Sequence, residues 1–316
     1  MARLPLVSPL DRALFLKAQP YFSGLAPNLL ALLASHSEEA FYPAGSRVRR
    51  AGDPISAIHY FGSGTFEVAH TFDGQTATYE VTAPGAIGLA DHFAETAFPA
   101  EVRAVVDTFC LALPTSDLDQ ILEDHFPLVQ QFARASGDSV VNLSKAQADS
   151  RFDEAGFEAS DLIETPAQLD LVQRLSRARR APFFKGTNLT LLAELIRLDE
   201  PERLAAGEIL WSEGDPIDRM VLVLDGRFRT NGRHGVARAG AGATLGAWEI
   251  AATGPRFEGW TAEVPSRILS IERELFIDLL EDHFEFAQAF LRRLSEQIVR
   301  GIREHARRQL ATGVGR

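Results

Sequence analysis

Hydrophobic and polar positions follow two periods along the first half of the chain, and each period predicts its own kind of element. Apolar residues that recur every three to four positions predict amphipathic helices. Short alternating or wholly apolar runs, bounded by Gly-Asp, Asp-Gly and Ser-Gly pairs, predict strands joined by tight turns. The expected helices cover 11–19, 26–36 and 116–136, and the expected strands include 57–61, 65–72 and 77–83.

The second half of the chain repeats this order of patterns. Its expected helices cover 169–180, 187–198 and 273–308, and strand patterns fill 219–230. Short strands at this spacing are typical of a small antiparallel barrel or jelly roll. Each half therefore reads as helices, then strands, then helices.

Direct sequence similarity indicates that the two halves are copies of one unit. PYFSG at Pro20 returns as PFFKG at Pro182, and PAGSRVRRAGDPI from Pro43 returns as AAGEILWSEGDPI from Ala205, in both cases 162 positions later. LEDHF at Leu122 recurs unchanged 158 positions later, so the second copy lacks four residues in between. A loss of this size in a turn-rich segment is what hairpin loops tolerate.

We predict an α+β fold of two tandem antiparallel barrel or jelly-roll domains, each flanked by helices. A chain of 316 residues with 46% hydrophobic positions is long enough to fill two cores. The domains are expected at 1–145 and 166–316, with a polar linker at 146–165.

Composition disfavours nucleic-acid-binding, membrane-bound and disulfide-stabilised classes of protein. The formal net charge of −11 disfavours non-specific binding to nucleic acid. No apolar run reaches the length of a membrane span, and the N-terminus has no secretory cleavage pattern, so we expect a cytoplasmic protein without membrane contact. The single cysteine, Cys110, excludes a disulfide framework, and its apolar surroundings predict an inert thiol.

Motifs of the common enzyme classes are missing from the sequence. The eight histidines form no H-x-x-H or H-E-x-x-H pattern, and there is no G-x-S-x-G or phosphate-loop motif. His125 and His283 are the repeat-matched histidines of LEDHF and follow Asp124 and Asp282. We interpret all four as packing or hydrogen-bonding residues near the last helix of each copy. We therefore expect no catalytic residue, no metal ligand and no enzyme activity.

The repeated motifs resemble the cyclic-nucleotide-binding domain. The resemblance rests on F-x-G-L near the start, on AGDPI followed by Y-F-x-S-G-x-F-E-V, and on a glycine-rich turn before the final helix. The resemblance covers nearly all of both copies. The domain that they resemble occurs in bacterial catabolite-activator regulators and, in tandem, in the regulatory subunits of cyclic-AMP-dependent kinase. It implies a phosphate-binding cassette, F-G-E-L-A … P-R-A-A-T. In that cassette, N–H groups at a helix start and the arginine bind the phosphate, and the glutamate accepts the ribose 2′-hydroxyl.

Relative to that cassette, the first copy has lost both charges. Gly88 keeps the glycine, but Leu89 stands at the glutamate position and Phe98 stands at the arginine position. Asp91 and Glu95 would repel a phosphate. We therefore do not expect the first copy to bind a cyclic nucleotide in the usual way.

The second copy keeps one of the two charges. Gly246 matches the glycine and Arg256 matches the arginine, nine positions after Ala247, which replaces the glutamate. Glu249 lies two residues too late, and its use for the ribose would shift the register and shorten the loop. Phe257 is bulky where the ligand is expected to approach.

Two tryptophans, Trp248 and Trp260, flank the second cassette, and two interpretations of them stay open. Their rings either cover a purine or fill the core around an empty pocket. Glu258 adds a like charge near a phosphate. The candidate ligand-binding residues of the second copy are Gly246, Ala247, Trp248, Glu249, Arg256 and Phe257, and the degenerate counterparts in the first copy are Gly88, Leu89 and Phe98.

The expected function is a non-catalytic regulatory or scaffold protein without a cofactor, and sensing of cyclic AMP or cyclic GMP through the second copy stays open. The alternative is a pure protein–protein interaction scaffold without a nucleotide ligand. Family members that bind DNA carry a helix-turn-helix after the last helix. No room remains for one before Arg316, so we expect no nucleic-acid partner.

The last helix suggests how protein partners could bind. Phe286, Phe290, Leu294 and Ile298 lie at helical spacing, and this stripe either packs on its own domain or forms a homodimer contact. Arginines on the outer face of the helix are either solvated or dock an unidentified acidic partner.

Overall fold

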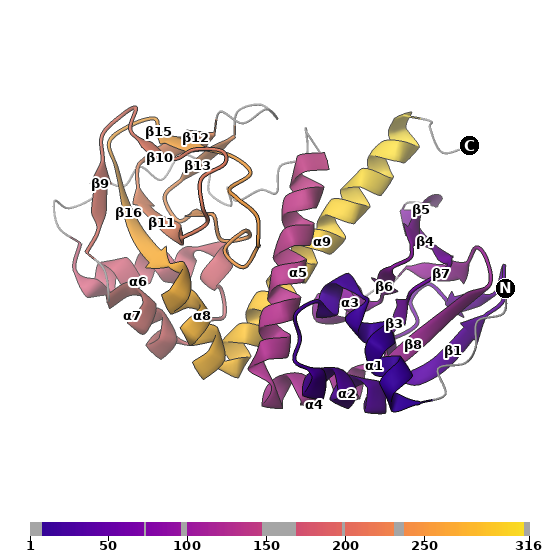
Figure 1. Ribbon diagram of the computed structural model, residues 1–316. Helices are drawn as coiled ribbons and strands as arrows, with labels where there is room; N and C mark the ends of the chain where they lie inside the picture. The colour runs from indigo at the N-terminus through magenta and orange to yellow at the C-terminus, as the bar shows by residue number, and fades with distance from the viewer. Residues whose placement is uncertain are drawn as a thin grey trace. The chain divides into compact units, whose positions relative to one another are not determined.

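The computed structural model describes residues 8–72, 74–95, 100–146, 169–197, 200–230 and 237–312 (Figure 1). The chain divides into two compact units. The first unit is Met1–Ala135 with Leu294–Arg316, and the second unit is Ser136–Arg293. The long helices α5 (Phe126–Ala146) and α9 (Phe284–Thr312) are each shared between the two units. The predicted domain boundaries stay a prediction, and the predicted linker lies, from residue 147 on, outside the described residues.

Two antiparallel sheets form the body of the first unit, with strand orders β1-β8-β3-β6 and β2-β7-β4-β5 (Figure 1). Their facing sides bury an apolar cluster that includes Phe61, Phe66, Val102 and Cys110. The elements are α1 (Pro9–Lys17), α2 (Pro27–His36), β1 (Glu38–Tyr42), β2 (Arg47–Arg49), β3 (Ala57–Phe61), β4 (Thr65–Phe72), β5 (Gln75–Thr82), β6 (Gly85–Ile87), α3 (Leu89–Phe93), β7 (Glu101–Ala104), β8 (Thr108–Pro114), α4 (Thr115–Asp124) and α5.

The second unit has the same architecture, with strand orders β14-β11-β16-β9 and β10-β15-β12-β13. The predicted α+β fold of two tandem jelly-roll-type domains is therefore confirmed, each domain having two four-stranded sheets. The elements are α6 (Leu171–Arg180), α7 (Leu189–Arg197), β9 (Glu202–Leu204), β10 (Ile209–Trp211), β11 (Arg219–Asp225), β12 (Arg227–Thr230), β13 (Arg238–Gly240), β14 (Thr244–Leu245), β15 (Trp260–Ala262), β16 (Ser266–Glu272), α8 (Arg273–Asp282) and α9.

The closing helix predicted for each copy is in fact a pair of helices. The break falls at His125 between α4 and α5, and at His283 between α8 and α9. The backbone at these residues leaves the helical region, with φ −136° and ψ 81° at His125 and φ −132° and ψ 86° at His283. The repeated LEDHF motif therefore marks a helix junction, and its aspartates end one helix rather than start the next.

The apolar stripe of α9 is buried in the chain. In the second unit, the rings of Phe286 and Phe290 lie 5.5 and 5.0 Å from the ring of Phe276 on α8. Phe290 also contacts Phe183, with ring centroids 6.1 Å apart. These edge contacts between aromatic rings fix the start of α9 on its own unit.

The glycines of the Ser-Gly turn in the first copy and of the matching Asp-Gly turn in the second copy have no room for a side chain. Gly64 and Gly226 are repeat-matched, and both have positive φ, at 102° and 93°. A Cβ added to Gly64 would lie 2.2 Å from Thr108 Oγ1, and one added to Gly226 would lie 2.6 Å from Cα of Ser266. Both turns therefore require glycine, because each turn packs directly against a strand, β8 in the first unit and β16 in the second.

Two glycine substitutions in the second unit separate the cost of backbone strain from the cost of steric overlap. Gly214 also has positive φ, at 95°, but an added Cβ would meet nothing within 4 Å. We expect Gly214→Ala to cost about 1 kcal/mol of unfolding free energy, from backbone strain alone. Gly226→Ala should cost about 3 kcal/mol or more, because the methyl group also overlaps Ser266. Urea unfolding followed by tryptophan fluorescence measures both, and equal costs would contradict the steric explanation.

Candidate functional site

The second cassette begins at Gly246, directly after β14, and ends where β15 begins at Trp260. Gly246 has φ 76°, and an added Cβ would lie 2.6 Å from Nη1 of Arg256. The residues after Gly246 form a run of turns, whereas those after Gly88 in the first unit form the short helix α3. The two cassettes therefore keep the glycine but differ in the backbone that follows it.

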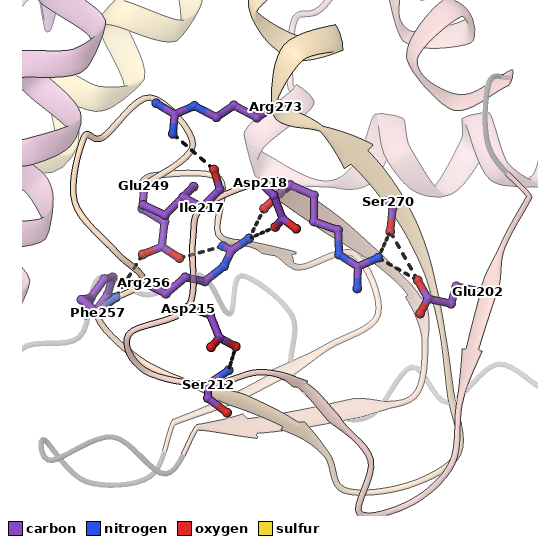
Figure 2. Close-up of polar contacts among 11 residues, drawn as sticks. Glu202, Ser212, Asp215, Ile217, Asp218, Glu249, Arg256, Phe257, Ser270 and Arg273 are labelled. Atoms are coloured by element: carbon purple, nitrogen blue, oxygen red, sulfur yellow. Dashed lines mark hydrogen bonds and ion pairs between the residues drawn. The ribbon is translucent and has the colours of Figure 1, made fainter.

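Arg256 is the charged centre of the second cassette, and its side chain is 0% exposed. Its Nη1 donates to Glu249 Oε1 at 2.9 Å, and its Nη2 donates to Asp218 Oδ1 at 3.3 Å and to the carbonyl oxygen of Arg219 (Figure 2). The guanidinium also lies over the ring of Trp211, 3.6 Å from the centroid. Protein groups thus surround the arginine that the sequence assigned to a phosphate.

Glu249 supplies the main counter-charge from inside the cassette. Its side chain is 5% exposed, and its Oε2 also accepts the N–H of Phe257 at 3.5 Å (Figure 2). Burial raises the pKa of Glu249, although Arg256 and the Phe257 N–H act in the opposite direction. Ala247, at the position of the family glutamate, is fully buried and has no polar side-chain atom. The carboxylate of Glu249, two residues later, therefore forms the ion pair with Arg256.

The repeated GDPI turn holds the backbone of Arg256. The N–H of Gly214 donates to the carbonyl of Arg256 at 2.9 Å, and the N–H of Arg256 donates to the carbonyl of Asp215 at 2.8 Å. The Asp215 carboxylate closes its own turn by accepting the N–H of Ser212 at 2.8 Å (Figure 2). The motif that identifies the repeat therefore also positions the cassette arginine.

Three residues of the site, Trp211, Asp218 and Arg273, were not singled out by sequence reasoning. Asp218 follows the GDPI turn directly, so that motif could have pointed to it. Arg273 is the first residue of α8, and it donates to the carbonyl of Ile217 at 3.2 Å (Figure 2). It also donates to the carbonyl of Ala252 at 2.9 Å. Its role depends on tertiary contacts, which no local pattern reveals.

The tryptophans beside the cassette are packed against protein side chains. Trp248 meets the ring of Phe183 edge-on, with centroids 5.6 Å apart, and its buried Nε1 has no hydrogen-bond partner among the described residues. Trp260 is 5% exposed and belongs to the core between the two sheets of the second unit. Glu258 accepts a hydrogen bond from Thr230 Oγ1 at 2.9 Å.

The first unit contains an analogous pair built from a different arginine. Arg49 on β2 donates to Asp91 on α3 at 3.0 Å and to the carbonyl of Ala100 at 3.1 Å. Asp91 is repeat-matched to Glu249, but Arg49 is repeat-matched to Trp211. Both cassettes therefore carry an internal arginine–carboxylate pair, with the arginine supplied by β2 in one and by the cassette loop in the other.

The other first-copy candidates are partly described. Leu89 is buried at the start of α3 behind Gly88, which has φ 93°. Phe98 lies outside the described residues. Cys110 is buried, and burial raises its pKa to about 12, as expected for an inert thiol.

A cavity of about 310 Å³ lies beside Arg49 in the first unit, and its lining includes Val48, Ile87 and His59. The phenol oxygen of Tyr42 lies 2.8 Å from Nε2 of His59. Burial, with Arg49 as the second cause, lowers the pKa of His59 to about 4. The imidazole is therefore neutral near pH 7, and its Nε2 can accept a hydrogen bond from the Tyr42 hydroxyl.

Within the part of the chain that the structure describes, no cluster of three or more His, Cys, Asp or Glu side chains could hold a metal ion. None of the described helices combines the length and apolarity needed to cross a membrane.

Comparisons with known proteins agree with the resemblance stated above. The chain matches the family described as cyclic nucleotide-binding domain over residues 39–125 and 201–283, which is more than half of its length. It is 29% identical over 147 residues to the cyclic AMP receptor protein of Thermus thermophilus, covering 45% of this chain and 65% of that protein. It is 25% identical over 127 residues to the CRP-like cAMP-activated global transcriptional regulator of Mycobacterium tuberculosis, covering 38% of this chain and 57% of that protein. The chain thus spans less than two thirds of these curated relatives.

Among solved structures, the regulatory domain of Toxoplasma gondii PKA with cAMP is similar at 15% identity and a TM-score of 0.34. The match covers 92% of this chain and 97% of that one.

The lowered pKa of His59 predicts how the stability of the folded state depends on pH. An unfolded imidazole has a pKa of roughly 6.5, above the folded value, so the unfolded chain takes up a proton first as the pH falls. The folded state should therefore lose stability between about pH 6.5 and pH 4, by no more than about 3 kcal/mol, and His59→Gln should remove that loss. An NMR titration of the His59 ring should give a pKa of about 4. Titration near the ordinary value would contradict the partly buried environment beside Arg49.

Proposed function

Because the chain belongs to the cyclic nucleotide-binding domain family, we propose that it is a non-catalytic regulatory protein that acts through contacts with another protein. In this proposal, the second cassette is kept closed by its own charges. The cytoplasmic location and the absence of nucleic-acid binding expected from the composition stay predictions.

One observation carries the proposal: the ion pair between Arg256 and Glu249, 2.9 Å long, with side chains 0% and 5% exposed. A phosphate that binds Arg256 would have to displace a carboxylate that is already attached to the same loop. An intramolecular partner acts at a high effective concentration, so a free ligand competes at a disadvantage. Removing Glu249 without replacement would also take away the nearer of the two carboxylates that contact this buried cation, which is costly.

Other features of the cassette support the same conclusion. Ala247 offers no acceptor for a ribose hydroxyl, and Phe257 stands where the family has a small residue. The adjacent aromatic rings already have protein partners, since the Arg256 guanidinium lies over the Trp211 ring and Trp248 meets the Phe183 ring edge-on. In the first unit, Asp91 pairs with Arg49 in a similar way, so neither cassette leaves an unpaired arginine for an anion among the described residues.

A second candidate function is sensing of cyclic AMP or cyclic GMP by the second unit. It is favoured by Arg256 itself, which stands at the family's phosphate-binding position. The names of the two curated relatives refer to cAMP. In this case a nucleotide would expel Glu249 from Arg256, and the freed loop would transmit the signal.

Binding measurements distinguish the two candidates. All three tryptophans lie in the second copy, so their fluorescence reports on this cassette alone. We expect wild type to show no saturable binding of cyclic AMP or cyclic GMP by fluorescence or calorimetry. Glu249→Gln should show saturable binding, at least about tenfold tighter than the weakest binding that the same assay detects, because Arg256 loses the nearer of its two carboxylate partners. Adding Arg256→Ala to that variant should abolish the gain.

Glu258→Gln is the matched control, because Glu258 is another acidic residue of the cassette loop and accepts a hydrogen bond from Thr230. It should bind like wild type, and circular dichroism establishes that each variant is folded. Micromolar binding by wild type that is lost in Arg256→Ala would replace the proposal with the sensor function. Binding that survives Arg256→Ala would place the nucleotide in another pocket.

A further inference from the structure

The loop that follows Glu249 is held by a residue from far earlier in the chain. Both carboxylate oxygens of Asp138, on α5, accept hydrogen bonds from Thr253: one from the backbone N–H at 2.8 Å and one from Oγ1 at 2.9 Å. Bonds to an ionised acceptor are stronger than neutral ones. Asp138 and Thr253 both belong to the second unit, although α5 starts in the first.

The backbone of α5 also lies directly against this loop. A Cβ added to Gly137 would lie 3.0 Å from the amide nitrogen of Ala252 and 3.3 Å from its Cα. Glycine at this helical position lets the helix approach the loop more closely than any other residue would. Asp138 and Gly137 are neighbours in sequence, so one turn of α5 makes both contacts.

The loop between Glu249 and Thr253 is short and fixed on its other side. The N–H of Ala252 donates to the carbonyl of Glu249 at 2.8 Å, and Arg273 donates to the carbonyl of Ala252 at 2.9 Å. A displacement of Thr253 is therefore passed through this turn to Glu249. Since the Glu249 carboxylate holds Arg256, the position of Thr253 affects the ion pair.

We propose that Asp138 is a positioning residue of the second cassette. It holds the loop in the place where Glu249 remains on Arg256, and α5 thereby controls whether Arg256 is available to an anion. Because α5 begins at Phe126 in the first unit, one continuous helix connects the first unit to the second cassette. This inference deepens the proposed function, but it concerns the resting protein and needs no ligand.

Hydrogen exchange of the full chain, read by mass spectrometry without any nucleotide, tests the proposal. Asp138→Ala should speed exchange of the amides in 249–256 by about tenfold, the size expected for the loss of a charge-assisted hydrogen bond. Exchange within β11 should not change. Asp138→Asn should restore most of the protection, because its amide oxygen can still accept the Thr253 N–H and its NH₂ can donate to Oγ1.

The matched control is Asp107→Ala. Asp107 in the first unit accepts the N–H of Ala44 at 2.8 Å, the same kind of carboxylate-to-backbone bond. Its loss should leave residues 249–256 unchanged. If Asp138→Ala fails to fold, Gly137→Ala serves instead, because its methyl group must push the loop away from α5.

Two results would overturn the inference. One is unchanged exchange at 249–256 in the folded Asp138→Ala or Gly137→Ala protein. The other is faster exchange spread equally over β11 and β16, which indicates general destabilisation. Nucleotide binding by the wild-type protein would refute the proposed function, in which Glu249 keeps Arg256 from a ligand, without changing the exchange result. Failure of the inference and failure of the proposed function are therefore distinguishable.

Discussion

A buried guanidinium must find its full counter-charge inside the protein, and in this chain that requirement organises the second cassette around Arg256. The carboxylates of Glu249 and Asp218 and the Arg219 carbonyl accept hydrogen bonds from the two Nη atoms of Arg256, and the Trp211 ring lies against the guanidinium. Gly246 is required because any side chain there would occupy the place of the guanidinium. The GDPI turn then fixes the arginine backbone from both sides. In the proposed function, the position of the family's ligand pocket is part of the protein's own electrostatic framework.

The two copies satisfy this requirement with different residues. The carboxylate stays at one matched position, as Asp91 or Glu249, while the arginine comes from β2 in the first copy and from the cassette loop in the second. Where one copy has Arg49, the other has Trp211, which stacks on Arg256 instead. Retention of the pair across this exchange indicates that the internal charge balance matters more than the identity of the arginine. It also explains why an alignment to the family cassette alone finds the first copy empty of charge.

The sequence predicts the fold well because the repeat and the strand periodicity are local signals that agree with each other. The GDPI and LEDHF repeats set the register, and the Asp-Gly and Ser-Gly turns mark the hairpins that the structure contains. The break at His125 and His283 was missed because apolar periodicity continues across it, while the backbone changes direction.

The site is less predictable for a physical reason. Arg256 can be found by spacing, but its partners cannot, because they depend on which atoms meet in three dimensions. Glu249 looked misplaced for a ribose, since its actual role concerns the arginine. No sequence pattern singles out Arg49, and Asp138 lies 115 positions before the threonine that it binds. Such contacts follow from the packing of helices on loops and leave no periodic trace in the sequence.

The central claim is that Arg256 belongs to Glu249 and not to a ligand, and a crystal structure of the wild-type protein grown in excess cyclic AMP tests it most directly. The account predicts the Arg256–Glu249 ion pair intact, with no nucleotide phosphate beside the guanidinium. A phosphate bound to Arg256, with Glu249 turned away from it, would contradict the account.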